Sequence, residues 1–592
     1  MRNYLLIATA IISLIACNSN KPSTMENSNA AFDSLLHEYY EDRLKLYPLE
    51  ATAIADERYN DQLPVDISDS YREKLKTFYS SYAEKFKTID RAALSGQSVL
   101  SFDIMQYEMK MQLEGLTFHD NLMPINQFWS MHISFPLLGS GSGNQPFKTV
   151  KNYDDFLGRI HGFTSYVDTM ISNMKRGMEM GIVPPKSLME KVLPQLTGII
   201  VKDPMQSVFA GPIKKFPESF STEDKKRLTE LYTTAIKNEI VPSYDKLHSF
   251  VKNEYLPKCR ATSGISEVPG GKEVYAYLAK FWTTTNLTPD EIYAIGEKEV
   301  ARIRGEMERI KTETGFTGTL KEFFHFIHTD KQFMPFKQDS DVINAYRAIE
   351  TKMQPQLKKL FNLVPKAKFE VRQTEAFREV SASAEYNQAA PDGSRPGIFY
   401  VPVLDPTKFN NVSMEDLFLH EAIPGHHYQT SIQQENKELP DFRRFGWYGA
   451  YGEGWALYTE SLGKELGLYT DPYQYFGALS EEMHRALRLV LDVGIHMKGM
   501  TREQAIAYSL DNETESEADI TAEVERYMAI PGQALAYKIG QMKILELRAR
   551  AEKELGSKFN IQAFHDEVLI NGCLPLEIFE KEVDRWIKAG GK

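Results

Sequence analysis

The stretch SMEDLFLHEAIPGHHYQ, residues 413–429, constrains the fold of this chain more than any other. It begins as a helix should: Ser413 is a residue type that caps free helix amides, and Ser413 with Asp416 approximates a capping box. Pro424 lacks the amide hydrogen that would continue the helix, so we expect the helix to end or kink there. An apolar helix carrying a His-Glu pair is therefore predicted to turn just before a His-His pair.

This stretch is an expanded form of the zinc-hydrolase motif His-Glu-x-x-His. In that motif two imidazoles one helical turn apart bind the metal, and the Glu acts on a water molecule. Here Pro424 stands in the place of the second imidazole and cannot bind zinc. We therefore interpret His420 and His426 as metal ligands and Glu421 as the general base, with His427 as the alternative second ligand. The simpler interpretation is a solvated helix end without a metal.

A third ligand comes from GWYGAYGEGWALYTESLGKELGLY, where Glu453 lies at the head of a second apolar helix. Two imidazoles and one carboxylate, with a fourth position left for water, are the ligand set of a catalytic zinc site. Glu460, seven residues after Glu453, is the second choice as a ligand, or a group that supports one. Without the first motif, Glu453 would read as an ordinary helix-start carboxylate.

Several strings resemble the bacterial family known as domain of unknown function 885. They are HEAIPGHH, EGWALYTESL and ERYMAIPGQALAYKIG, joined by YLAKFWTTTNLTPDEIYAIGEKEVARI and, near the N-terminus, YPLEATAIADERYNDQL. That family resembles the zinc peptidases of the thimet oligopeptidase, angiotensin-converting enzyme and Taq carboxypeptidase group. The resemblance implies a mainly α, large helical zinc-peptidase-like fold with a deep cleft and a small β-sheet near the metal-binding helix. Those motifs carry Gly just before the second His ligand, which favours His426 over His427.

The resemblance also implies roles for residues near the C-terminus. Arg526-Tyr527 is similar to the Arg-Tyr pair of the angiotensin-converting enzyme group, so Tyr527 is expected to stabilise the oxyanion of a tetrahedral intermediate, with Tyr537 as the alternative. A solvated helix face is the simpler interpretation of the cations among the candidate substrate-binding residues. These candidates are Arg485, Arg488, His496, Arg526, Tyr537 and Lys538.

The N-terminus, MRNYLLIATAIISLIACNSNKPSTMEN, has the order of features of a bacterial lipoprotein signal. Arg2 precedes an apolar run too short to span a bilayer, and the run ends in Leu-Ile-Ala-Cys, which looks like a lipobox. We expect residues 1–16 to be a signal peptide, Cys17 to carry the lipid, and residues 17–30 to form a polar tether. This places the protein in the bacterial cell envelope, facing the periplasm or on the outer membrane. The alternative is a plain secretory peptide with an incidental cysteine.

The rest of the chain is predicted to form two helical halves of one continuous fold, residues 31–268 and 269–592. Amphipathic patterns predict helices at 71–89, 153–180 and 223–251. Thr288 is expected to cap a helix that starts at Pro289. The segment ATSGISEVPGGKE, residues 261–273, is expected to be a linker, and MHISFPLLGSGSGNQP a Gly/Ser-rich loop.

Two short stretches rich in β-branched and aromatic residues, KFEVRQ at 368–373 and GIFYVPVL at 397–404, are predicted strands. By analogy with zinc peptidases, PGIFYVP, which contains Tyr400, is expected to offer a sheet edge to the substrate backbone. A purely structural hairpin is an equally good interpretation. Cys259 and Cys573 could pair in an oxidising envelope, although two cysteines in so long a chain are more often unpaired packing residues.

The charge composition of the chain limits the kinds of binding partner that we expect. The 592 residues carry a formal charge of −12, and no basic patch dominates, which argues against nucleic acid. We expect an envelope-anchored, zinc-dependent peptidase that hydrolyses short peptides, with carboxypeptidase-like or dipeptidase-like action as one form of it. It would meet the membrane only through the lipid on Cys17. The alternatives are a metallohydrolase of a non-peptide amide and a non-catalytic binding lipoprotein.

Overall fold

The computed structural model describes residues 24–374, 379, 383–391, 393 and 395–591, and this part of the chain is mainly helical, as predicted. The helices up to residue 268 are α1 (Thr24–Leu46), α2 (Pro48–Ala53), α3 (Asp69–Lys87), α4 (Gln97–Gly115), α5 (Met131–Gly139), α6 (Val150–Met180), α7 (Lys186–Ile199), α8 (Gly211–Lys214), α9 (Thr222–Ala235) and α10 (Val241–Phe250). Those that follow are α11 (Gly271–Thr283), α12 (Pro289–Glu313), α13 (Leu320–Thr329), α14 (Asp339–Leu357), α15 (Met414–Glu421), α16 (His426–Glu435), α17 (Asp441–Arg444), α18 (Gly449–Ser461), α19 (Pro472–Met497), α20 (Arg502–Leu510), α21 (Glu517–Ala529), α22 (Ala536–Leu555), α23 (Ile561–Ile570) and α24 (Leu576–Lys588). None of the helices in the described residues has both the length and the apolar character needed to cross a membrane.

The N-terminal part of the structure differs from the expected tether. The predicted signal peptide and Cys17 lie outside the described residues, and the description starts with α1, so residues 24–30 are helical. Asn29 shows why: its Nδ2 donates to Ser95 Oγ at 3.0 Å, and its Oδ1 accepts from the Ser95 amide at 3.1 Å. Polar composition suggested a free segment, but this polar side chain has a partner in the folded chain.

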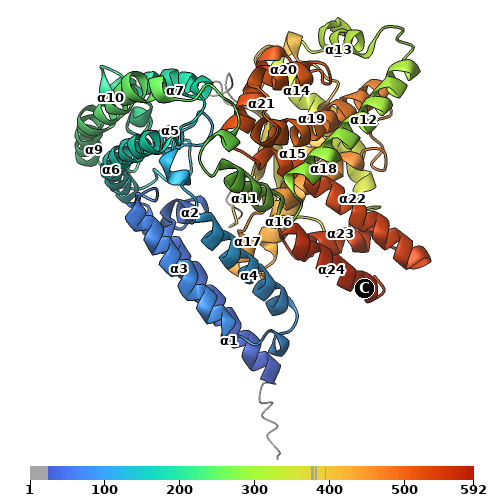
Figure 1. The fold of residues 1–592 in the computed structure, drawn as a ribbon, viewed down its shortest axis with the longest axis horizontal. Helices are drawn as coiled ribbons and strands as arrows, with labels where there is room; N and C mark the ends of the chain where they lie inside the picture. The colour runs from blue at the N-terminus through green and yellow to red at the C-terminus, as the bar shows by residue number, and fades with distance from the viewer. Residues whose placement is uncertain (1–23, 375–378, 380–382, 392, 394, 592) are drawn as a thin grey trace, which may run out of the picture.

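The two predicted halves share their hydrophobic core. Figure 1 shows α1, α3 and α4 as a long arm, with α6, α9 and α10 beyond it and the helices from α11 onward on the other side of the molecule. One buried cluster nevertheless joins Phe163 and Tyr244 to Leu487 and Val524. A second joins Leu100 to apolar residues of the stretch 413–429. Burial of apolar surface thus crosses the boundary at residue 268.

The arrangement of the small sheet shows that the predicted substrate-binding edge is wrong. It consists of β1 (Phe369–Gln373), β2 (Glu385–Asn387) and β3 (Gly397–Val401), in the order β1-β3-β2. β3 is the central strand, parallel to β1 with Phe369 opposite Gly397 and antiparallel to β2 with Tyr386 opposite Phe399. Every residue of β3 is buried. PGIFYVP is therefore not an edge, because a strand sandwiched between two neighbours has no free backbone groups to offer.

Two long helix pairs frame the C-terminal half: α12 packs along α19, and α18 packs along α22. Thr288 caps α12 as predicted, in a capping box with Glu291. The α18–α22 pair is unusually close because glycines face each other. A Cβ added at Gly454 would lie 2.5 Å from Gly540, and one added at Gly540 would collide with the Ala450 carbonyl oxygen. The crossing fixes α18, and with it the backbone at Glu453, against the core.

The predicted linker and the cysteines are both packed into the fold. Within residues 261–273, the amide of Ile265 donates to His496 Nδ1 at 2.9 Å, so this segment is docked on α19 rather than free. Cys259 is half-buried and Cys573 is buried, and both are free thiols. Their placement in different hydrophobic clusters explains why they do not pair.

Candidate metal centre

The predicted break in the motif helix is present. α15 ends at Glu421, and α16 begins at His426 after a tight turn. A side chain at Gly425 would collide with the backbone oxygen of His420, so only glycine lets the chain turn this closely. The carbonyl groups freed by the break find donors on α18: Trp455 Nε1 donates to Pro424 O at 2.9 Å, and Thr459 Oγ1 donates to Leu419 O at 2.9 Å.

The start of the motif helix differs from the predicted capping box. Ser413 makes no capping hydrogen bond with its side chain. The acidic residues of the first turn bind the segment after α18 instead: Glu415 accepts from the Tyr469 amide at 2.6 Å, and Asp416 accepts from the Tyr469 hydroxyl at 2.8 Å. Tertiary partners thus replace the local cap at this end of α15.

The turn brings the two predicted histidine ligands to the same carboxylate. His420 Nε2 lies 3.7 Å and His426 Nε2 lies 3.5 Å from one oxygen of Glu453, and the two imidazole rings are nearly perpendicular, with centroids 4.9 Å apart. Donor atoms bound to a single tetrahedral zinc ion would lie roughly 3.3–3.6 Å apart. The spacing and the donor types therefore fit a zinc ion that His420, His426 and Glu453 could hold, with Glu421 also within reach.

Charge complementarity supports this grouping. Burial alone raises the pKa of Glu453, but hydrogen bonds and charge interactions with His420 and His426 outweigh it and hold that pKa well below its ordinary value. Glu453 therefore stays ionised although it is largely buried. An ionised carboxylate beside two imidazoles is a ligand set that suits a divalent cation such as zinc.

Glu460 orients the first histidine. Its Oε1 lies 2.7 Å from His420 Nδ1, the ring nitrogen that points away from Glu453. Burial lowers the pKa of His420, yet the two carboxylates Glu453 and Glu460 more than compensate and raise it well above its ordinary value. A carboxylate on the far nitrogen of a metal-binding histidine fixes the ring and makes it a stronger ligand. Glu460 lies in the position of such a support rather than of a ligand.

His427 points away from this group. Its Nδ1 pairs with the Tyr386 hydroxyl at 2.9 Å, and its ring packs on Phe369 of β1, with centroids 5.1 Å apart. Burial lowers the pKa of His427 to about 4, so the ring is neutral near pH 7. The structure thus places His426 beside the other candidate ligands and His427 against the sheet.

Glu421 completes the polar group. One carboxylate oxygen of Glu421 and ring nitrogens of His420 and His426 all lie within 4.8 Å of one another. Burial raises the pKa of Glu421 above its ordinary value, although the two histidines and a hydrogen bond from the Tyr386 backbone oppose this. A carboxyl group with a raised pKa next to a candidate metal site is suited to accept and return a proton.

These groups open into a cavity of about 500 Å³. Its walls include the polar residues of the centre, the edge strand β2, the exposed ring of Trp447, and cationic and aromatic side chains from α19, α21 and α22. The lining residues are Ser383, Ala384, Glu385, Tyr386, Gln388, Leu417, His420, Glu421, His426, Thr430, Trp447, Glu453, Arg485, Arg488, Glu523, Arg526 and Tyr537.

Comparison with known proteins assigns the chain to a family. A family model described as a bacterial protein of unknown function, DUF885, matches residues 48–583. The chain belongs to the DUF885 family. No curated protein matches this sequence.

Solved structures share the fold. The crystal structure of a candidate lipoprotein from Colwellia psychrerythraea is 29% identical, with a TM-score of 0.87, over 95% of this chain and 99% of that one. The structure of a candidate lipoprotein of unknown function from Shewanella oneidensis is 20% identical, with a TM-score of 0.72, over the same shares of the two chains. The DUF885 match includes the whole candidate metal centre, since all of its residues lie between 48 and 583.

Four of the predicted site residues do not line this cavity. Tyr527 is 2% exposed, with its hydroxyl beside Arg488, and the neighbouring Tyr537 lines the cavity in its place. His496 is fully buried: its Nδ1 accepts from the Ile265 amide, and its Nε2 donates to the Tyr527 carbonyl oxygen. Tyr400 lies in the buried central strand β3. None of these three side chains reaches the candidate metal centre. Their burial depends on tertiary packing, which cannot be predicted from residue type alone.

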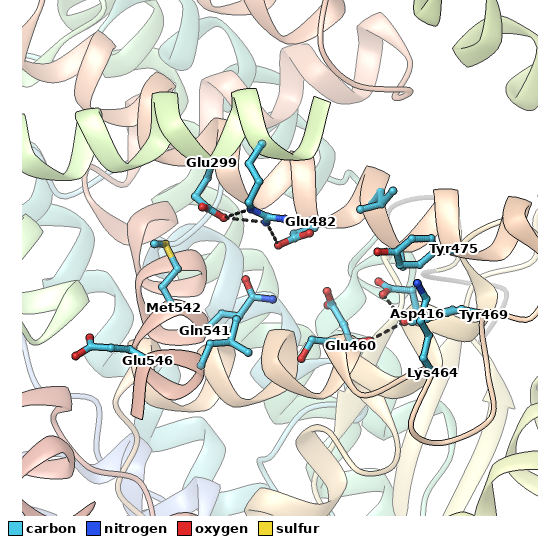
Figure 2. Close-up of a pocket in the computed structure, with 15 residues that line it drawn as sticks. Glu299, Asp416, Glu460, Lys464, Tyr469, Tyr475, Glu482, Gln541, Met542 and Glu546 are labelled. Carbon is cyan, nitrogen blue, oxygen red and sulfur yellow. Dashed lines mark hydrogen bonds and ion pairs between the residues drawn. The ribbon is translucent and has the colours of Figure 1, made fainter. Parts of the chain in front are cut away.

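The fourth, Lys538, is paired with carboxylates of a different cavity. It is 1% exposed and binds Glu482 at 2.7 Å and Glu299 at 3.2 Å, and both carboxylates line a second cavity of about 540 Å³ (Figure 2). Figure 2 shows Glu460 among the residues that line this second cavity. Glu460 therefore belongs to the wall of one cavity and contacts His420, which lines the other.

Tyr386, Glu523 and Trp447 are among the cavity-lining residues that the sequence motifs did not identify. Tyr386 lies on a three-residue strand, too short for a periodic pattern. Glu523 lies three residues before Arg526 on the same helix. This spacing of opposite charges was the signal that the sequence offered for it. Trp447 is 44% exposed, and its ring lies 6.0 Å from that of His426. A large aromatic residue just before the glycine-rich start of α18 was the signal there.

Proposed function

We propose that this DUF885 protein is a zinc-dependent peptidase that hydrolyses short peptides. The observation that carries the proposal is the convergence of His420, His426 and Glu453 on one point, with Glu421 beside them and Glu460 behind His420. Such a ligand set leaves a coordination position open, which is the feature that separates catalytic from structural zinc sites.

The residues around that point have the chemistry that amide hydrolysis needs. A zinc ion held there would polarise the scissile carbonyl and make a water molecule acidic. Glu421, with its raised pKa, takes the proton of the attacking water and returns it to the leaving amine. Tyr537, which lines the same cavity, supplies a hydroxyl donor toward the developing oxyanion in the role first expected of Tyr527.

The shape of the cavity supports a peptide substrate. β2 is an edge strand of the described sheet and lines the cavity, so it can pair with an extended backbone. The Tyr386 backbone already hydrogen-bonds Glu421, which places this edge next to the base. A volume of about 500 Å³ is in the range of small-molecule sites and accommodates a few residues rather than a folded protein.

We also propose that the protein is a lipoprotein of the cell envelope, anchored through Cys17. The lipobox-like end of the N-terminal apolar run supports this, and so does the description of the Colwellia structure as a candidate lipoprotein. The anchor would leave the cavity in the aqueous compartment outside the membrane.

Metal content and the Glu421→Gln variant test the function together. Purified protein is expected to bind about one zinc ion per chain, and Glu421→Gln is expected to keep the zinc and lose about 10²–10⁴-fold in turnover of a mixture of short peptides followed by mass spectrometry. Glu415→Gln is the matched control, because Glu415 is also buried on α15 but binds Lys352 and Tyr469 outside the cavity. This control should stay within a few-fold of the wild type.

A different experimental result would contradict each part of the proposal. Failure to take up zinc after reconstitution would remove the metal centre. Full activity of Glu421→Gln would remove Glu421 as the base. A zinc-loaded protein that cleaves no peptide would favour the other two classes, a hydrolase of a different amide or a binding lipoprotein.

A further inference from the structure

The metal cavity has a strongly cationic wall that the chemistry at the metal does not use. The metal ligands come from α15, α16 and α18, whereas Arg485 and Arg488 project from α19 and Arg526 from α21. We refer to these three arginines as the arginine wall. All of them line the cavity together with Tyr537 of α22.

The carboxylates around the arginine wall do not balance its charge. Glu523 is shared: it lies 3.0 Å from Arg488, 3.2 Å from Arg526 and 3.6 Å from His484. Arg485 has its own partner, Glu481. Arg488 and Arg526 therefore share a single carboxylate, so this wall carries more guanidinium than carboxylate charge, while Glu385, Glu421 and Glu453 line other parts of the cavity.

Arg488 also has unused hydrogen-bonding capacity. It is 5% exposed, and in the described part of the chain its Nε and Nη1 have no hydrogen-bond partner, nor does the buried Nε of Arg485. The Arg488 guanidinium stacks on the Tyr537 ring at 4.6 Å, and Arg526 Nη2 lies 3.5 Å from the Tyr537 hydroxyl. Buried donors without an acceptor are costly, and the planar guanidinium is shaped to bind a carboxylate through two parallel hydrogen bonds.

We infer that the arginine wall is a binding subsite for a carboxylate of the substrate, in the same cavity as the metal centre. This rests on the proposed function, which supplies the peptide that bears the carboxylate. A peptide offers two such groups, the C-terminal carboxylate and an acidic side chain. If it is the C-terminal one, a cavity of about 500 Å³ holds that end and the reacting bond together, so the enzyme removes residues from the C-terminus.

Binding to the base-less protein tests the subsite without interference from turnover. Zinc-loaded Glu421→Gln protein is titrated calorimetrically with N-acetyl-trialanine, with its C-terminal amide, and with the amide of N-acetyl-alanyl-glutamyl-alanine. We expect a peptide that carries a carboxylate to bind at least about tenfold more tightly than the trialanine amide, the effect of a charge-assisted bidentate contact. Tight binding of the free acid identifies the C-terminal carboxylate as the ligand, and tight binding of the glutamyl amide identifies the side chain.

Variants assign the effect to the arginine wall. Arg526→Gln and Arg488→Gln, each added to the Glu421→Gln protein, are expected to reduce the preference to about threefold or less. Arg526 has a 23% exposed side chain, so its variant should fold even if the buried Arg488→Gln does not. Arg550→Gln is the matched control: Arg550 is 27% exposed, is ion-paired to Glu580, and does not line the cavity, so the preference should remain.

Equal affinity for all three peptides, or a preference that survives Arg526→Gln and Arg488→Gln, would overturn the inference. The outcome for the proposed function is separate. A wild-type protein that prefers carboxylates but cleaves no peptide would contradict the peptidase and leave the subsite standing. A protein that cleaves all three peptides equally well would keep the peptidase and remove the subsite.

Discussion

The adjacent residues His426 and His427 contact different parts of the structure because the turn at Pro424 and Gly425 changes the direction of the chain. His426 faces Glu453, whereas His427 faces the sheet. His427 holds the two sides of the sheet in place: it hydrogen-bonds the backbone of Ala367 just before β1 and the hydroxyl of Tyr386 on β2. It thereby ties α16 to both β1 and β2.

Because the two histidines have different contacts, their alanine variants are expected to affect zinc affinity and stability in opposite ways. His426→Ala removes a candidate ligand and should lower zinc affinity by more than about 100-fold, beyond the loss usual for a supporting residue. His427→Ala should keep stoichiometric zinc with affinity within about tenfold, and lose about 1–3 kcal/mol of unfolding free energy because it leaves buried polar groups unpaired. Competition with a chelator gives the affinities, and urea denaturation gives the stability. Loss of zinc in His427→Ala with retention in His426→Ala would reverse the assignment.

At the residue scale, the sequence was most informative where chemistry depends on residue type and spacing. His420, His426 and Glu453 were selected as partners from such a pattern, and the structure brings them together. Tyr527 was selected by the same kind of local similarity, yet the structure presents Tyr537 to the cavity. Which of two tyrosines on successive helices faces a cavity depends on how those helices are rotated in the core, and local sequence does not determine this.

At the scale of elements, the position of Glu453 depends on the contact between α18 and α22. Gly454 follows Glu453 directly and touches the backbone of Gly540. The close approach lets the two helices pack along their length, and it holds the carboxylate at the depth where both histidines reach it.

A methyl group at this contact should therefore disturb both stability and metal binding. In Gly454→Ala the added Cβ would lie 2.5 Å from Gly540, so the helices must separate, at a cost of about 1–3 kcal/mol. Zinc affinity should fall as well, because Glu453 moves with α18. Gly305→Ala is the control: Gly305 is inside α12 with nothing within 4 Å, so alanine there should be neutral or stabilise by up to about 1 kcal/mol. Thermal unfolding and chelator competition measure the two effects, and a Gly454→Ala protein equal to wild type in both would show that the contact is not needed.

Elements with a strong local signal were predictable. The long amphipathic helices and the Thr288 cap are confirmed, because periodicity and capping residues are properties of the local sequence. The segment 131–139 was expected to be a loop but is the helix α5, since its apolar residues pack into the core despite the glycine-rich residues that follow. β3 was correctly predicted as a strand and wrongly as an edge, because a strand's neighbours come from distant parts of the chain.

At the scale of the whole molecule, the candidate metal centre depends on residues far from it in sequence. The buried cluster containing Phe163 and Tyr244 includes Leu487 of α19, the helix that also carries the arginine wall. Arg443 of α17 similarly binds Gln97 and Ser101 of α4. The boundary near residue 268 therefore separates two stretches of sequence and not two independent cores.

The segment 269–592 is accordingly expected not to fold by itself, although it contains every candidate metal ligand. Without residues 24–268, α21 would lose its packing on α7 and the buried cluster shared by the two segments would be divided, which exposes apolar surface that promotes aggregation or partial folding. The isolated segment should show no cooperative thermal transition by circular dichroism and should bind zinc far more weakly than residues 24–592 purified in parallel. Co-expression with the segment 24–268 should restore both properties, because the shared core can then form. A segment 269–592 that unfolds cooperatively and holds one zinc ion without its partner would show that the metal centre is built by the C-terminal half alone.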